Sequence, residues 1–95
     1  MSELFYKINK NSVFFRNYKK ESIVAKNENK MIFVFTGIYS YMWRQLNKPV
    51  KMNDLFKLTI LKYNIDKKNT KKTNKILEYF LDTMISENLI KKTSN

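Results

Sequence analysis

The chain has 95 residues, a formal net charge of +11 at pH 7 and a hydrophobic fraction of 43%. This length suits one domain with one hydrophobic core, and the apolar content is too high for a chain that is disordered throughout. The sequence contains no cysteine and no histidine, which excludes disulfides, thiolate metal sites, cysteine nucleophiles and the commonest general base.

The first half of the chain predicts three consecutive β-strands. Residues 12–18 and 21–27 are rich in β-branched and aromatic side chains, and a polar lysine pair separates them. Residues 27–30 form the clearest turn signal in this half. A continuous apolar run, unlike an alternating one, predicts a strand that is covered on both faces. The strongest strand prediction is such a run: Met31, Ile32, Phe33, Val34 and Phe35.

The second half predicts three helices, over about 37–47, 53–63 and 70–88. The second helix has little polar surface, so we expect it to lie between other elements. The third carries a broad apolar stripe. Asn88 can adopt the left-handed conformation that ends a helix, and we expect residues 91–95 to fray.

The predicted fold is therefore a single α+β domain over residues 1–95, with the element order βββααα. Three helices beside a small antiparallel sheet are typical of a winged helix-turn-helix, with the second and third helices as the turn pair. No signal peptide opens the chain, and no apolar run approaches the roughly 20 residues that span a bilayer. We therefore expect a soluble, cytoplasmic protein.

Several packing and turn signals resemble one known family. In the first predicted helix, Met42-Trp43 is followed by Leu46. The second helix contains Leu55-Phe56 and ends in the sequence Tyr-Asn-Ile-Asp at residues 63–66. The third helix ends in Asn88, which two aliphatic residues follow. From about residue 12 to 92, this pattern resembles a PqqD-like domain, also called a RiPP recognition element. The chain departs from the family where Asn47-Lys48 replaces the usual Asp-Gly and Asn88 replaces the usual glycine.

The resemblance implies a binding protein without catalytic residues, cofactor or metal. Such domains bind the leader segment of a ribosomally synthesised precursor peptide and present the core segment to a modifying enzyme, often a radical SAM enzyme, a cyclodehydratase, a lanthipeptide dehydratase or a lasso-peptide protease. A free edge of the third strand can pair with an extended peptide. We predict a peptide-binding site in which the third strand forms one wall and the third helix the other: Met31, Ile32, Phe33, Val34, Phe35, Lys71, Lys72, Lys75, Ile76 and Tyr79.

Other interpretations remain open for these residues. The apolar run could be core alone, Trp43 is expected to be core, and the lysines could form a solvated face in a composition rich in Lys and Asn. Glu78 and Asp82, at i,i+4 spacing, indicate a helix-surface pair of charges. The alternative function is a winged-helix DNA- or RNA-binding protein, because the net charge suits phosphates. Against it, the third helix lacks the Arg, Gln and Asn residues that are expected to contact base edges, apart from Asn74. A structural subunit is a further alternative.

Overall fold

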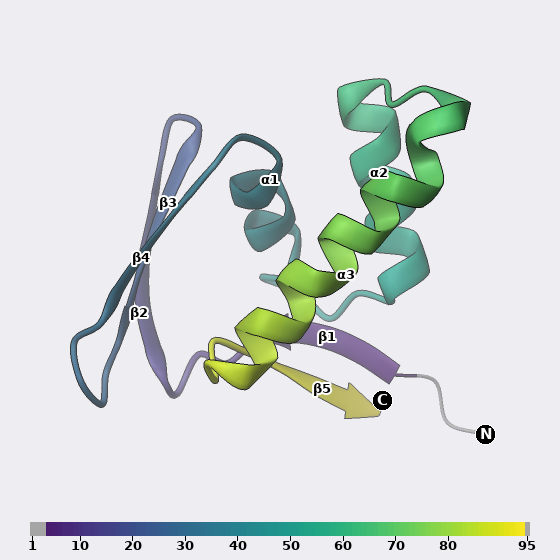
Figure 1. Cartoon of the computed structure of the whole chain (residues 1–95). Coiled ribbons are helices and arrows are strands. Elements are labelled where there is room, and N and C mark those ends of the chain that lie inside the picture. The colour runs from purple at the N-terminus through teal and green to yellow at the C-terminus, as the bar shows by residue number, and fades with distance from the viewer. Residues whose placement is uncertain (1–3, 95) are drawn as a thin grey trace.

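The computed structural model describes residues 4–94 and has an α+β fold (Figure 1). In chain order its elements are β1 (Leu4–Ile8), β2 (Val13–Tyr18), β3 (Glu21–Lys26), β4 (Ile32–Thr36), α1 (Gly37–Gln45), α2 (Met52–Tyr63), the short 3-10 helix η1 (Lys67–Asn69), α3 (Thr70–Ser86) and β5 (Ile90–Ser94).

The predicted three-stranded antiparallel sheet is confirmed, with the strand order β2-β3-β4. Two tight turns join its strands, and each contains a lysine in the left-handed region: Lys19 with φ 53° and Lys30 with φ 60°. Because successive side chains alternate between faces, the paired residues Phe15, Val24 and Phe33 share one face. This face packs against α1, which contacts both β3 and β4.

A second sheet corrects the expected βββααα order. β1 precedes the three predicted strands and pairs with β5 at the other end of the chain, so residues 91–94 form a strand and do not fray. Tyr6 and Val50 also exchange two backbone hydrogen bonds, of 2.8 and 3.0 Å. Tyr6, Ile8 and Ile90 are buried. The pairing joins residues that are more than 80 positions apart, so local sequence patterns could not relate the two segments.

The three helices are confirmed, with boundaries that differ from the prediction by one or two residues. Asn64 and Asn88 both adopt positive φ, 50° and 64°, where α2 and α3 end. The expectation that α2 lies between other elements is wrong. Its buried residues lie on one side, while Leu58 is 41% and Leu61 78% exposed.

Trp43 lies at the centre of the core and is fully buried, as expected. Its ring contacts Phe15 at 5.4 Å and Phe35 at 5.6 Å between centroids, which fixes α1 to the inner face of the sheet. Leu77, Leu81 and Met84 of α3 belong to the same core. Within residues 4–94, no helix is both long and apolar enough to cross a membrane.

Candidate binding site

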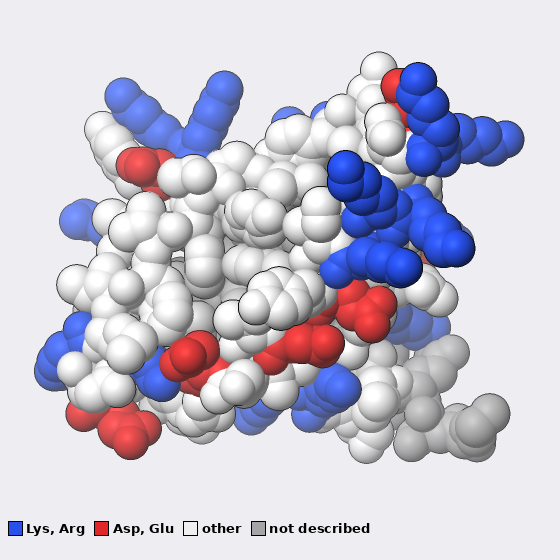
Figure 2. Space-filling model, in the orientation of Figure 1, with Lys and Arg blue, Asp and Glu red and all other residues white. Residues whose placement is uncertain are grey.

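β4 has a free edge. Across the described part of the chain it pairs with β3 alone, because it is the last strand in the order β2-β3-β4. The opposite edge of β4 therefore presents backbone N–H and C=O groups that no strand occupies. α3 runs past the sheet on the side of this strand (Figure 1). We call the hollowed surface between the helix and the sheet, where the sequence predicts the binding site, the groove (Figure 2).

Aromatic rings form the inner part of this site. Phe35 of β4 contacts Phe80 of α3, with 5.1 Å between ring centroids and planes at 85°. Phe80 also contacts Tyr39 of α1 at 4.7 Å, and Phe33 lies 6.4 Å from Phe35. Phe33 is half-buried and Phe35 is buried, so their side chains point inward while the backbone edge of β4 stays free.

The other face of the sheet is exposed and apolar. Ile32 and Val34 are 64% and 57% exposed, which corrects the expectation that both faces of this strand are covered. Ile23 pairs directly opposite Val34 and is also exposed, and the neighbouring strand adds Phe14. The helices cover only the inner face of the sheet. The continuous apolar run therefore contains residues that point into the core and residues that point to an open face. A contiguous apolar surface of this kind is typical of an interaction site.

The side chains of α3 divide between the groove and the solvent. With about 100° between successive residues, Ile76 lies about 40° and Lys72 about 80° from Phe80 around the helix axis. Tyr79 lies next to Phe80 and is 75% exposed, and Ile76 is 46% exposed. Ile76 and Tyr79 therefore lie on the exposed side of Phe80, whereas Lys72 lies about two turns away along the helix, in a hollow that it shares with residues 64–69.

Two of the predicted lysines point elsewhere. Lys75 lies about 140° and Lys71 about 180° from Phe80 around the axis of α3. Both are exposed, and Lys71 in particular lies on the outward surface rather than on the wall of the groove. They can act on a ligand in the groove through long-range attraction, but the helix geometry does not direct Lys71 into it.

Charges of opposite sign occupy the two halves of α3. The exposed lysines 71, 72 and 75 lie in its first half, and the exposed carboxylates Glu78 and Asp82 lie in its second half. Figure 2 shows the lysines gathered at one end, carboxylates towards the other, and a hollowed, uncharged surface between the helix and the sheet.

An ion pair fixes the direction of α3 relative to the sheet. Lys26 Nζ donates to Glu87 Oε1 at 3.2 Å, just after the end of α3. The backbone N–H of Lys26 also donates to the carbonyl of Met31 at 2.9 Å. The end of α3 therefore lies near the start of β4, and the basic end of α3 points away from it.

The structure thus brings together part of the predicted site. Phe33 and Phe35 belong to the ring cluster with Phe80, and Ile76 and Tyr79 lie on the exposed side of that ring. The side chains of Ile32 and Val34 point to the open face of the sheet, Met31 is half-exposed just before β4, and Lys71, Lys72 and Lys75 lie away from the ring cluster. Sequence reasoning missed Phe80 as a wall residue, although the apolar stripe of the third helix included it. Among the described residues, no group of three or more Asp, Glu, His or Cys could hold a metal ion.

Comparison of the chain with models of known protein families, with curated proteins and with solved structures finds no match.

Proposed function

We propose that this chain is a leader-peptide recognition domain of the PqqD-like type, with a winged helix-turn-helix arrangement extended by the β1–β5 pair. It binds an extended segment of a ribosomally synthesised precursor as a fourth strand on β4 and presents the rest of the precursor to a modifying enzyme, such as a radical SAM enzyme, in the cytoplasm. The observation that carries this proposal is the free edge of β4, which α3 approaches through the contact of Phe35 with Phe80.

Backbone pairing alone is too weak for useful affinity. An added strand along β4 forms about five hydrogen bonds, each of which contributes about 1 kcal/mol net. A dissociation constant of about 1 µM requires about 8 kcal/mol. Apolar side chains of the peptide must therefore contribute by packing on the groove. Phe33, Phe80, Ile76 and Tyr79 offer that apolar surface.

The nucleic-acid alternative finds less support on α3. Glu78 and Asp82 continue the outward surface of Lys71 and Lys75, since the four residues follow an i, i+4, i+7, i+11 spacing. A recognition helix in a major groove would bring these two carboxylates close to phosphates. Asn74, the candidate base-reading residue, is half-buried, and its side-chain oxygen is buried.

The experiment that tests the proposal is a pair of titrations. A labelled short peptide encoded beside this gene and a random DNA duplex are each titrated with the protein at several salt concentrations. We expect saturable peptide binding that persists at moderate salt, with backbone amide NMR shifts concentrated in β4. Preferential duplex binding that falls steeply with salt would contradict the proposal.

A modified peptide makes the same experiment specific for strand addition. N-methylation at alternate positions removes backbone donors from the peptide without changing the protein. If the peptide pairs with β4, one set of alternate N-methyl groups abolishes binding and the other set is tolerated. Equal effects of the two sets on binding would contradict pairing of the peptide with β4 through one of its edges.

A further inference from the structure

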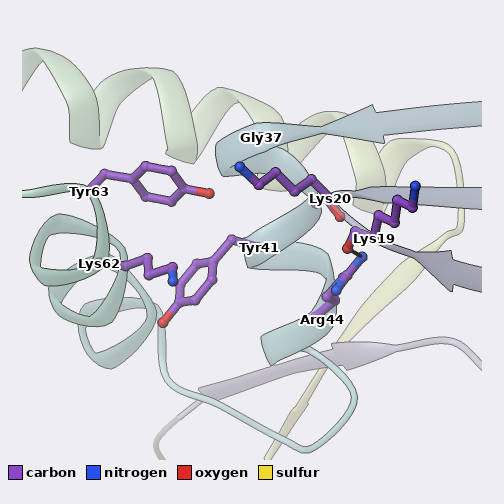
Figure 3. Close-up of a pocket in the computed structure, with 8 residues that line it drawn as sticks. Lys19, Lys20, Gly37, Tyr41, Arg44, Lys62 and Tyr63 are labelled. Carbon is purple, nitrogen blue, oxygen red and sulfur yellow. Dashed lines mark hydrogen bonds between the residues drawn. The ribbon is translucent and has the colours of Figure 1, made fainter.

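A second cavity lies away from the groove between β4 and α3. It has a volume of about 470 Å³ and is lined by residues of three segments. The β2–β3 turn contributes Lys19 and Lys20, the end of α2 contributes Lys62 and Tyr63, and α1 closes the cavity between them (Figure 3). Among the described residues that line it, none belongs to β4 or α3.

The lining of this cavity is strongly positive. Lys20, Arg44 and Lys62 contribute cations, and the residues that line the cavity in the described part of the chain include no carboxylate. The ammonium of Lys19 points away from the space and lies 5.5 Å from the ring of Tyr18 (Figure 3). Like charges around one space repel each other, which costs stability unless an anion is bound. An anionic ligand would remove that cost and gain charge-assisted hydrogen bonds.

The first turn of α1 adds to the positive potential. Gly37 begins the helix and lines the cavity, the preceding Thr36 makes no side-chain capping bond, and no acidic residue lies in this turn. The free amides at a helix start favour an anion nearby. A side chain at position 37 would be strained, because Gly37 has φ +56°.

Arg44 holds the wall of the cavity in place. Its Nη2 donates to the backbone carbonyls of Lys19 and Glu21, which fixes the β2–β3 turn to α1. Its Nε is buried and has no hydrogen-bond partner within residues 4–94. On the floor, the buried Ser40 shares a 2.7 Å hydrogen bond with the buried Ser22. Wall and floor are therefore ordered before any ligand arrives.

Two tyrosines make the remaining side of the cavity aromatic. The rings of Tyr41 and Tyr63 meet edge to face, with 5.9 Å between centroids and planes at 85°. Figure 3 shows the Tyr63 hydroxyl and the end of the Lys20 side chain pointing toward one another across the space. Tyrosine rings pack well against planar groups. The cavity thus combines cations on one side with an aromatic surface on the other.

From this combination we infer that the cavity binds a small phosphate ester that carries a planar ring, which is the chemistry of a nucleotide. The lysines and the start of α1 receive the phosphate, and Tyr41 and Tyr63 receive the ring. The volume lies within the range of small-molecule sites, about 300–1,000 Å³. Inorganic phosphate alone would leave the aromatic side empty.

Titrations followed by amide NMR and by calorimetry test this inference. The probes are adenosine 5′-monophosphate, adenosine and inorganic phosphate. We expect saturable binding of the monophosphate, with shifts at Lys20, Gly37 and Tyr63, and at least about tenfold weaker binding of both fragments. Absence of saturable binding up to millimolar concentrations, or phosphate that binds as tightly as the nucleotide, would overturn it.

Matched variants locate the site. Lys62→Glu should weaken binding of the monophosphate by about tenfold, because it replaces a lining cation with an anion. Lys57→Glu is the control, since it makes the same charge change at an exposed position of α2 that does not line the cavity. Tyr63→Ala should reduce affinity for the monophosphate and leave phosphate binding unchanged. Equal effects of Lys57→Glu and Lys62→Glu would show only a general charge effect and would refute the site.

Discussion

The ring of Phe35 in β4 meets the ring of Phe80 in α3 edge to face, with 5.1 Å between their centroids. This contact joins the free-edged strand to the helix that forms the opposite wall of the groove. It therefore links the stability of the domain to the shape of its candidate binding site.

A double-mutant cycle should measure this link. Phe35→Leu and Phe80→Leu keep apolar volume and remove the ring pair, so we expect a coupling free energy of about 0.5–1.5 kcal/mol from urea unfolding. Phe33→Leu combined with Phe80→Leu is the control, because no ring contact joins that pair. Additivity of the Phe35 and Phe80 effects within about 0.3 kcal/mol would argue against the packing described.

Adjacent residues of β4 should respond very differently to truncation. Phe35→Ala removes a buried ring and should cost about 3–5 kcal/mol of unfolding free energy. Val34→Ala changes a side chain that is 57% exposed and should cost less than about 1 kcal/mol. Thermal or denaturant unfolding of the two variants checks this. Similar losses at both positions would indicate that the outer face of the sheet is covered in solution.

β4 shows which structural features could be predicted from the sequence and which could not. The run at residues 31–35 and the turns before it predicted a strand of the three-stranded sheet, because β-branched and aromatic residues signal strands locally. The run could not reveal that one face is open, since burial depends on where the helices pack. The apolar run indicated that Ile32 and Val34 are buried, although both are exposed in the fold.

The pairing of distant strands was the larger part of the fold that the sequence did not predict. Little strand signal is present in Lys91, Lys92, Thr93 and Ser94. They form a strand because they pair with β1 at the other end of the chain. Likewise, the sequence predicted Lys71 as a residue of the binding site, but only the position of Phe80 shows that Lys71 points away from the groove. The cavity near Tyr63 also depends on three segments whose proximity is a property of the fold.

Loss of β5 should destabilise the domain. A chain that ends after Ile90 loses four of the five residue pairs between β1 and β5, and the 5.7 Å contact of Lys92 with the ring of Tyr6. At about 4–8 °C per kcal/mol, a loss of about 1–2 kcal/mol lowers Tm by several degrees. Lys91→Ala with Lys92→Ala is the control that keeps the strand. A truncated chain with unchanged Tm would support the fraying originally expected from the sequence.

Charge reversal on α3 should weaken peptide binding without unfolding the domain. Lys72→Glu with Lys75→Glu changes the local charge by four units at exposed positions, so we expect affinity for an acidic leader to fall by at least about tenfold at low salt. Lys67→Glu with Lys68→Glu makes the same change in η1, outside the groove. Circular dichroism establishes that both variants are folded. Unchanged affinity in the first variant would remove the basic half of α3 from the site.

The order of charges along α3 predicts the polarity of the bound peptide. Every pairing in the sheet is antiparallel, and an added strand that continues this pattern enters near Thr36 and leaves near Met31. The ion pair of Lys26 with Glu87 lies near Met31, so the first half of the peptide lies toward the basic end of α3 and the second half toward its acidic end. The charges on the outward surface of α3 act on the peptide through long-range attraction and not through direct contact.

A peptide with acidic residues before its apolar middle and basic residues after it should therefore bind more tightly than one with the two ends exchanged. We expect a difference of about fivefold at low ionic strength, which shrinks as salt screens the charges. Fluorescence anisotropy with both peptides measures it, and composition is matched because only the order changes. A preference for the exchanged peptide would mean that the added strand runs parallel to β4, and equal affinity at low salt would mean that α3 does not read the charge of the ligand.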